Sequence, residues 1–249
     1  MHIEEMNIKR IPLIIPAYEP DERLILLAKE IRKSEFEKVI IVNDGSGEKH
    51  NYIYSEAQRI IGEERCILLI HDINRGKGRA LKTAFEYVIK KMPDIVGVVT
   101  ADSDGQHSVE CIQKVMEALV DNRQNLILGV RQFDDDSIPW KSRIGNTLTL
   151  KIFKLLSGLD VQDTQTGLRG IPNAFVRELI NVDGERFEFE MEMLIASVNK
   201  YPIKQVPIKT IYESKSNHQT HFDPLTDSIK IYRIIFKRFL QSLLKNKEV

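Results

Sequence analysis

One stretch decides the fold: Ile95-Val96-Gly97-Val98-Val99-Thr100-Ala101-Asp102-Ser103-Asp104-Gly105-Gln106-His107. Its first half is apolar and rich in β-branched residues, which predicts a buried strand. Asp102 and Asp104, two residues apart at the exit of that strand, can face the same way. So much negative charge calls for a divalent cation or a proton, and Gln106 can add a third oxygen. Carboxylate and amide oxygens suit Mg²⁺ or Mn²⁺ better than zinc. The alternative is an Asx-rich turn that caps the next helix.

Around this stretch, the first 130 residues or so alternate predicted strands with predicted helices. The strands are the apolar runs at 11–15, 39–42, 67–70, 95–99 and 126–129, and the helices cover 21–33, 52–61, 75–91 and 108–120. This alternation predicts an α/β fold with a parallel sheet and right-handed crossovers. Ligands of such sheets bind beyond the carboxyl ends of the strands. The polar clusters lie at those ends, at 16–20, 43–47, 74–78, 102–107 and Arg131. We therefore expect them to form one site.

The second half of the chain is less regular. An amphipathic helix is predicted over 141–156 and another helix over 185–199, and 203–212 alternates around Pro207 in a way that suits an edge strand. Residues 162–170 form a polar segment bounded by glycine, followed by Pro172 at a predicted helix start. With no repeat and no sharp change of composition, we expect one domain over 1–225 and a C-terminal helix over 226–249.

Composition excludes some classes of function. The chain has 249 residues, 42% of them hydrophobic, and a formal net charge of zero, so no overall field attracts nucleic acid. Cys66 and Cys111 lack metal-ligand spacing, and Cys66 begins an apolar run, so it is predicted to be a core thiol in a reducing compartment. The first residues lack the apolar core of a signal peptide, and no run of about 18 apolar residues predicts a membrane span. We expect a cytoplasmic protein.

The C-terminal segment 228–247 is predicted to be a basic amphipathic helix. Its apolar residues at helical spacing are Ile229, Tyr232, Ile235, Phe236, Phe239, Leu240, Leu243 and Leu244. Lysines and arginines surround them, and such a helix can lie in the interface of an anionic membrane. We therefore expect peripheral contact with the inner face of the cell membrane. The alternative is a helix that packs on its own domain or on a partner.

Five motifs, in order along the chain, resemble those of family 2 glycosyltransferases. They lie at 16–18, 42–46, 74–80, 102–107 and 162–167. The subgroup most similar to this pattern contains the dolichyl-phosphate mannose synthases and the bacterial polyprenyl-phosphate glycosyltransferases. The resemblance implies a GT-A fold, with a mostly parallel sheet that binds a nucleotide sugar. It also implies inverting, metal-dependent transfer of a hexosyl unit from a GDP- or UDP-sugar to a polyprenyl (dolichyl or undecaprenyl) phosphate. The motifs do not choose the sugar.

The resemblance implies roles for the residues at matching positions. Asp44 would hydrogen-bond the nucleobase, while Pro16, Ala17 and Tyr18 would line the base and ribose. Asp102, Asp104 and Gln106 would hold Mg²⁺ or Mn²⁺, which neutralises the departing diphosphate. Arg131 and Arg143 fall where the subgroup places basic residues near phosphates. The turn with Gly76 and Gly78 would bring backbone close to the nucleotide, with Lys77 nearby.

The acceptor decides which further groups are needed. A hydroxyl acceptor needs a general base, whereas a lipid phosphate is already largely ionised and needs cations instead. The candidate cations are Arg143, Arg169, Lys215, His218 and His221. The candidate bases are Asp163 and Glu190, for which helix capping or pairing with arginine is the alternative role.

Other functions fit parts of the pattern. The main rival is a soluble family 2 transferase that acts on a glycan hydroxyl. A non-catalytic protein that binds a sugar nucleotide would use the same pocket. A haloacid-dehalogenase phosphatase places its Asp-x-Asp motif on the first strand rather than the fourth. A glycosidase needs two carboxylates that flank a sugar, which neighbouring loop positions do not provide.

Overall fold

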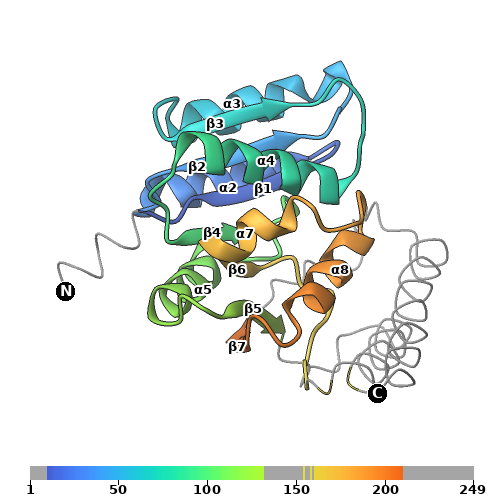
Figure 1. The fold of residues 1–249 in the computed structure, drawn as a ribbon. Helices are drawn as coiled ribbons and strands as arrows, with labels where there is room; N and C mark the ends of the chain where they lie inside the picture. The colour runs from blue at the N-terminus through green and yellow to red at the C-terminus, as the bar shows by residue number, and fades with distance from the viewer. Residues whose placement is uncertain (1–9, 132–153, 155–157, 159, 210–249) are drawn as a thin grey trace, which may run out of the picture.

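The computed structural model describes residues 10–131, 154, 158 and 160–209 (Figure 1). These residues form a sheet of seven strands in the order β3-β2-β1-β4-β6-β5-β7. The strands are β1 (Leu13–Ala17), β2 (Val39–Asn43), β3 (Cys66–Ile70), β4 (Gly97–Thr100), β5 (Leu126–Arg131), β6 (Arg169–Pro172) and β7 (Ile203–Ile208). The strands predicted from the first 130 residues are confirmed, with boundaries shifted by a few residues at most.

The sheet is mixed, because one strand runs against the others. Strands β1, β2, β3 and β4 pair in parallel, and β7 pairs in parallel with β5. Strand β6 lies between β4 and β5 and is antiparallel to both. The sequence pattern did not predict β6, since its four residues include an arginine, a glycine and a proline. The predicted edge strand is confirmed as β7. Pro207 costs little there, because among the described strands only β5 pairs with β7 and its other side is unpaired.

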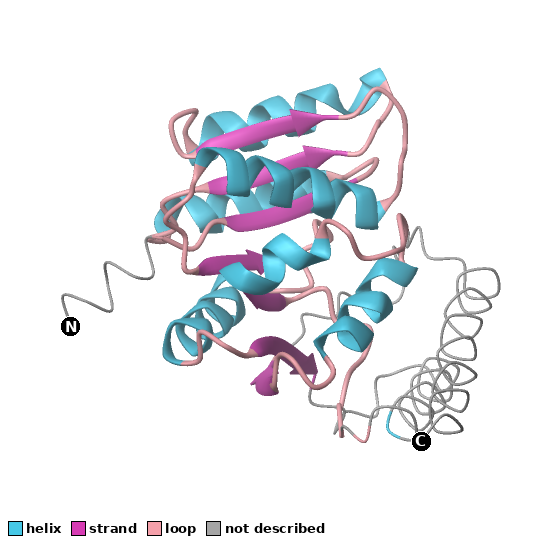
Figure 2. Ribbon diagram, in the orientation of Figure 1, coloured by secondary structure: helices cyan, strands magenta, loops and turns pink. Residues whose placement is uncertain are grey.

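Helices cover both faces of the sheet (Figure 2). The described helices are α2 (Glu22–Lys33), η1 (Glu48–His50), α3 (Asn51–Ile61), α4 (Lys77–Lys91), α5 (Val109–Asp121), α7 (Asn173–Leu179) and α8 (Glu188–Ser197). Helices α2, α3 and α5 contribute to one buried apolar cluster, and α4, α7 and α8 contribute to the other. Successive residues of β1 point into opposite clusters, Leu13 and Ile15 into the first and Ile14 into the second.

Two of the predicted helix starts are fixed by side-chain caps. Asp21 accepts a hydrogen bond from the backbone N–H of Arg23 at the start of α2, and Ser108 accepts one from Cys111 at the start of α5. Ser108 directly follows the Asp102–His107 stretch, so its cap determines where that loop ends and α5 begins. Within the described part of the chain, no helix is long and apolar enough to cross a membrane. The predicted helices over 141–156 and 226–249 and the domain boundary at 225 lie essentially outside the described residues.

Candidate active site

A cavity of about 660 Å³ lies at the carboxyl ends of the parallel strands. Most of the predicted site residues in the described part of the chain line it. These are Pro16, Ala17, Tyr18, Asp44, Lys77, Asp102, Asp104, Gln106, Arg131 and Glu190. Further residues of the predicted motifs also line it: Asn74, Gly76, Ala80, Ser103, Thr164 and Gln165. Arg186, Phe187 and Met191, which the sequence pattern did not single out, complete the wall. The polar clusters at the strand ends thus lie around one cavity, as expected.

Asp44, at the exit of β2, fixes the turn before α4 by accepting hydrogen bonds from its backbone. Its Oδ1 accepts hydrogen bonds from the backbone N–H of Arg75 at 2.9 Å and from His71 Nδ1 at 2.8 Å. Its Oδ2 accepts one from the backbone N–H of Gly76 at 2.8 Å. His71 Nε2 in turn lies 2.9 Å from Thr83 Oγ1. His71 was not among the predicted site residues, although its place directly after β3 is the same kind of strand exit that marked the others.

The glycines of the 74–80 motif let the start of α4 pack closely against the segment that begins α8. Gly76 has a φ of +103°, and a Cβ there would lie 2.4 Å from the carbonyl oxygen of Glu185. A Cβ on Gly78 would lie 2.6 Å from the Cβ of Phe189, on α8. This turn therefore packs closely against the segment that begins α8. Gly76 and Lys77 also line the cavity, so the close approach of the turn to the nucleotide stays a prediction.

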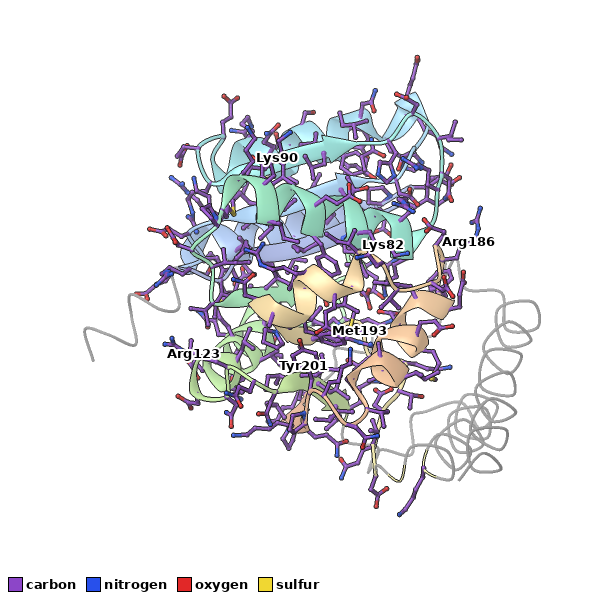
Figure 3. All side chains as sticks on the ribbon, viewed as in Figure 1. Lys82, Lys90, Arg123, Arg186, Met193 and Tyr201 are labelled. Carbon is purple, nitrogen blue, oxygen red and sulfur yellow. The ribbon has the colours of Figure 1, made fainter. Side chains whose placement is uncertain are left out.

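Ion pairs reinforce this junction between α4 and α8. Arg79 forms a bidentate pair with Glu185, and Lys82 Nζ lies 3.2 Å from Glu185 Oε1. Lys82 is also 5.0 Å from the centre of the Phe189 ring, a cation–π contact, and Figure 3 shows it on the side of α4 that faces α7 and α8. Arg186 Nη1 donates to Asn74 Oδ1 at 3.3 Å. The start of α8 is thus fixed against the turn that Asp44 clamps.

Lys77 joins the Asp-x-Asp loop to α8 across the floor of the cavity. Its Nζ lies 2.7 Å from Asp102 Oδ1 and 2.8 Å from Glu190 Oε1. Burial works against the charge of Lys77, but the two carboxylates outweigh it and raise its pKa. Burial also disfavours the charge of Asp102, and Lys77 again outweighs it, so the pKa of Asp102 is lowered. Both groups are therefore charged at neutral pH.

Asp104 forms no ion pair with any of the described residues, unlike Asp102. Burial and the neighbouring charge of Asp102 raise its pKa. Its Oδ1 accepts a hydrogen bond from the backbone N–H of Gln106 at 3.0 Å, so the Asx turn considered as an alternative is present. Among the described residues no three His, Cys, Asp or Glu side chains form a metal cluster. Asp102, Asp104 and Gln106 line the same cavity and offer the hard oxygens that Mg²⁺ and Mn²⁺ prefer, so the donor set fits such an ion.

Arg131, at the end of β5, is oriented by Asp163. Its Nε lies 2.6 Å from Asp163 Oδ2 and its Nη2 lies 3.1 Å from Asp163 Oδ1. Asp163 is fully buried and also accepts from the backbone N–H of Gln165 at 3.0 Å. This bidentate pair fixes the guanidinium at the cavity wall. The geometry does not favour the predicted role of Asp163 as a base, because its carboxylate faces Arg131 and is absent from the cavity lining.

Arg169, at the start of β6, is also withdrawn from the cavity. It is 1% exposed, and its guanidinium donates to the carbonyl oxygens of Thr164, Thr166 and Glu190. Burial lowers its pKa. This position does not support the predicted contact of Arg169 with an acceptor phosphate. Arg169 instead links the 164–166 loop to α8 by hydrogen bonds. The remaining candidates, Arg143, Lys215, His218 and His221, lie outside the described residues.

Comparison with known proteins gives the family. The family model described as glycosyl transferase family 2 matches residues 13–179. A UDP-N-acetylglucosamine–dolichyl-phosphate N-acetylglucosaminyltransferase of Methanococcus voltae is 30% identical over 223 residues, which cover 84% of this chain and 88% of that protein. The residues that the family model matches include every strand from β1 to β6 and all five motifs in full.

Solved structures agree with the fold. The glucosyl-3-phosphoglycerate synthase of Mycobacterium tuberculosis superposes with a TM-score of 0.65 at 14% identity, covering 92% of this chain and 80% of the other. A mannosyltransferase of Pyrobaculum calidifontis, solved with GDP-mannose and Mn²⁺, gives a TM-score of 0.55 at 14% identity, covering 82% of this chain and 56% of the other. The predicted GT-A architecture is confirmed. With its model match over two thirds of the sequence, the chain belongs to glycosyl transferase family 2 and is a glycosyltransferase.

Proposed function

We propose that the protein transfers a hexosyl unit from a nucleoside diphosphate sugar, linked to GDP or UDP, to a polyprenyl phosphate, with inversion and with the aid of Mg²⁺ or Mn²⁺. The observation that carries the proposal is the single cavity lined by Asp44 at one strand exit and by Asp102, Asp104 and Gln106 at another. A nucleotide sugar needs both a base site and a diphosphate site, and the two strand exits provide one each.

The donor would lie across the ends of β1, β2 and β4. Asp44 would accept from the base, and Pro16, Ala17 and Tyr18 would contact the base and ribose. The diphosphate would then reach Asp102 and Asp104, which would hold the ion, and that ion would neutralise charge on the leaving group. Arg131, held in place by Asp163, would contact phosphate oxygens from the far wall. Lys77 would add a second positive charge at the floor.

The acceptor proposal rests on chemistry and on the relative from Methanococcus voltae, whose name states that it acts on dolichyl phosphate. A phosphate nucleophile is already ionised near neutral pH, so no base is required. This suits the described site, in which Glu190 is paired with Lys77 and Asp163 with Arg131. Arg143, Lys215, His218 and His221 remain the proposed phosphate contacts, and the segment 226–249 remains the proposed contact with the inner face of the membrane.

A donor panel tests the proposal. The full chain is incubated with UDP- and GDP-sugars and Mn²⁺ or Mg²⁺, with and without a short-chain polyprenyl phosphate, and the glycolipid and the free nucleoside diphosphate are measured. We expect product only when lipid phosphate and metal are both present. Turnover with glycan hydroxyls and none with lipid phosphate would favour the soluble transferase instead. Binding without turnover on any acceptor would favour a sugar-nucleotide-binding protein.

Substitution at the proposed metal site sharpens the test. Asp104→Asn keeps the shape of the side chain and removes its charge, and we expect a loss of at least about 100-fold in kcat. The matched control is Asp121→Asn, at the exposed end of α5, which should leave kcat unchanged. Equal losses in the two variants would contradict the assignment of the metal site.

A further inference from the structure

In the described part of the chain, four large apolar side chains are exposed to solvent. Leu26 is 53% exposed, Tyr52 56%, Ile70 65% and Ile73 69%. Single apolar residues scattered over a surface are normal in soluble proteins and need no explanation. These four are not scattered, because all of them belong to segments at the carboxyl edge of the sheet, where the cavity of the candidate active site lies. We call the four residues the apolar rim.

The parallel strands β1, β2 and β3 place the apolar rim at this edge. Ile70 is the last residue of β3, and Ile73 lies in the loop between β3 and α4. Tyr52 is in the first turn of α3, which follows the exit of β2. Leu26 is in the second turn of α2, which follows the exit of β1. The arrows of these parallel strands end on the same side of the molecule in Figure 2.

Two contacts connect the segments that carry the apolar rim. The hydroxyl of Tyr52 donates to Glu22 Oε1 at 2.8 Å, and Glu22 lies one turn before Leu26 on α2. The loop after β3 packs on the exit of β2, where a Cβ on Gly45 would lie 2.0 Å from the carbonyl carbon of Ile73. The exits of the three strands therefore form one continuous part of the surface.

A second hollow, of about 420 Å³, adds apolar surface beside the rim. Leu26 and Leu27 line it from α2, and Val109 lines it from the start of α5. Asp104 and Gln106 line both this hollow and the cavity of the candidate active site. The apolar surface thus reaches from the exit of β3 to the back of the Asp-x-Asp loop.

The charges around the apolar rim do not favour a strongly charged partner. The exposed ionised side chains of these segments carry both signs: Asp21, Glu22, Glu48, Lys49, Asp72 and Arg75. Attraction to an oppositely charged surface therefore contributes little at this edge, and burial of apolar area would be the main driving force for a contact. A lipid bilayer offers such burial without a complementary charge pattern.

We propose that the apolar rim rests on a lipid bilayer, so that the cavity beside it faces the membrane surface. The inference rests on the proposed function, in which the acceptor is a lipid phosphate. The phosphate of such a lipid lies among the headgroups while its chain stays in the hydrocarbon, so a cavity at a membrane-bound edge meets the phosphate without extracting the lipid. Tyr52 suits the interface, because its ring is apolar and its hydroxyl is hydrogen-bonded. This contact is separate from the one proposed for the basic segment 226–249.

Sedimentation of the full chain with vesicles tests the contact. The triple variant Leu26→Gln, Ile70→Thr and Ile73→Thr removes apolar surface without altering charge. We expect its binding to phosphatidylcholine vesicles to be at least about 10-fold weaker, because three side chains lose apolar burial. The fold-change should be the same after phosphatidylglycerol is added. The matched control is Met92→Gln, at the end of α4 on the opposite edge of the sheet, which should leave binding unchanged.

Two results of the vesicle experiment overturn the proposal. One is equal binding of the triple variant and the unaltered chain. The other is a triple variant that keeps vesicle binding but loses self-association in size-exclusion chromatography, because the edge would then be an interface between protein chains. If the triple variant does not fold, Ile73→Thr alone decides, since its side chain is 69% exposed and lies in a loop.

Turnover on two forms of the acceptor separates this inference from the proposed function. The acceptors are a short-chain polyprenyl phosphate in solution and a long-chain one in phosphatidylcholine vesicles. We expect kcat/KM of the triple variant to fall at least about 10-fold with the vesicles and to be unchanged in solution. Equal losses with both acceptors would overturn the inference, because the rim would then act on the site itself. No turnover by the unaltered chain on either acceptor, together with vesicle binding that depends on the rim, would remove the proposed acceptor and support the membrane contact.

Discussion

Replacing Lys77 with methionine tests whether its ammonium holds the floor of the cavity together. The side chains of Lys77, Asp102 and Glu190 are 15%, 29% and 10% exposed, and Lys77 Nζ lies 2.7 and 2.8 Å from the two carboxylates. Methionine keeps most of the stem and leaves the carboxylates without their shared partner. Breaking a buried ion pair costs about 3–5 kcal/mol. Because water partly screens Asp102, we expect the lower end, about 3 kcal/mol.

Thermal unfolding at pH 7 measures this loss. For a domain of this size, 1 kcal/mol lowers the midpoint by roughly 2–4 °C, so the variant should unfold roughly 6–12 °C lower. The control is Lys114→Met, which removes the exposed pair between Lys114 and Glu110 on α5 and should not move the midpoint measurably. Mn²⁺ should raise the midpoint of Lys77→Met more than that of the unaltered chain, because the added cation relieves the repulsion between Asp102 and Glu190.

The ion pairs of Lys77 stabilise the fold only within a defined pH range. The pKa of Asp102 is lowered in the fold, so its contribution is complete above the unfolded value of about 4 and is lost as the pH falls through the folded value. The pKa of Lys77 is raised, so its contribution is complete below about pH 10.4 and is lost as the pH rises through the folded value. The gap between the two midpoints should therefore be widest from about pH 5 to pH 10. Equal midpoints for Lys77→Met and Lys114→Met within this window would refute the reasoning.

Three further predictions concern the frame around the site. Gly78→Ala should lower the free energy of unfolding in urea by about 1–3 kcal/mol, because its Cβ would meet Phe189. Gly47→Ala, whose Cβ would have nothing within 4 Å, should leave that free energy unchanged. Equal losses in the two variants would contradict the close packing at Gly78. Arg169→Met should lower stability by about 3 kcal/mol or more, because buried carbonyls lose their donor, and a variant with normal stability but no turnover would instead restore a catalytic role. Burial raises the pKa of the Cys66 thiol to about 12, so the free energy of unfolding should fall by about 1.4 kcal/mol per pH unit above about pH 8.5. Cys66→Ala should flatten that slope, and an unchanged slope would contradict the assignment.

The sequence was sufficient for the elements whose burial follows a simple period. The five parallel strands were predicted because their residues are continuously apolar, and all of them except the edge strand β3 are almost completely buried. The starts of α2 and α5 were predicted within one residue, and in the structure the side chains of Asp21 and Ser108 cap them. These signals are local, so no tertiary contact was needed to read them.

Strand β6 could not be predicted in the same way. Its residues, Arg169 to Pro172, have poor strand propensity, and its pairing depends on partners far away in the chain. Gly97 in β4 has no side chain because a Cβ there would lie 2.3 Å from the carbonyl oxygen of Ile171. Leu119 of α5 covers the same point. The strand exists because small residues let β4, β6 and α5 approach closely, which a one-dimensional pattern does not reveal.

For the site, the positions of the polar residues could be predicted from the sequence, but their partners could not. The residues at the strand exits were expected to meet a ligand, and most of them line the cavity. The sequence did not show which partners these residues have in the fold. Lys77 pairs with Glu190 and Asp163 pairs with Arg131. Asp44 accepts a hydrogen bond from the backbone of a turn. These contacts join residues 31 to 113 positions apart in the chain, and only the topology of the sheet brings them together.

The reversed strand explains how the last motif reaches the site. Residues just before a strand lie at its amino end, and a parallel strand would place them at the edge of the sheet opposite the cavity. Because β6 is antiparallel to β4 and β5, its amino end lies beside their carboxyl ends, so the segment 162–168 enters the cavity wall directly. There Gly167 receives a hydrogen bond from Thr100 at 2.8 Å, and a Cβ on Gly167 would lie 2.3 Å from Asp102 Oδ2. The antiparallel strand β6 thus places the 162–167 motif directly against the Asp-x-Asp loop, where a side chain at position 167 would displace the Asp102 carboxylate.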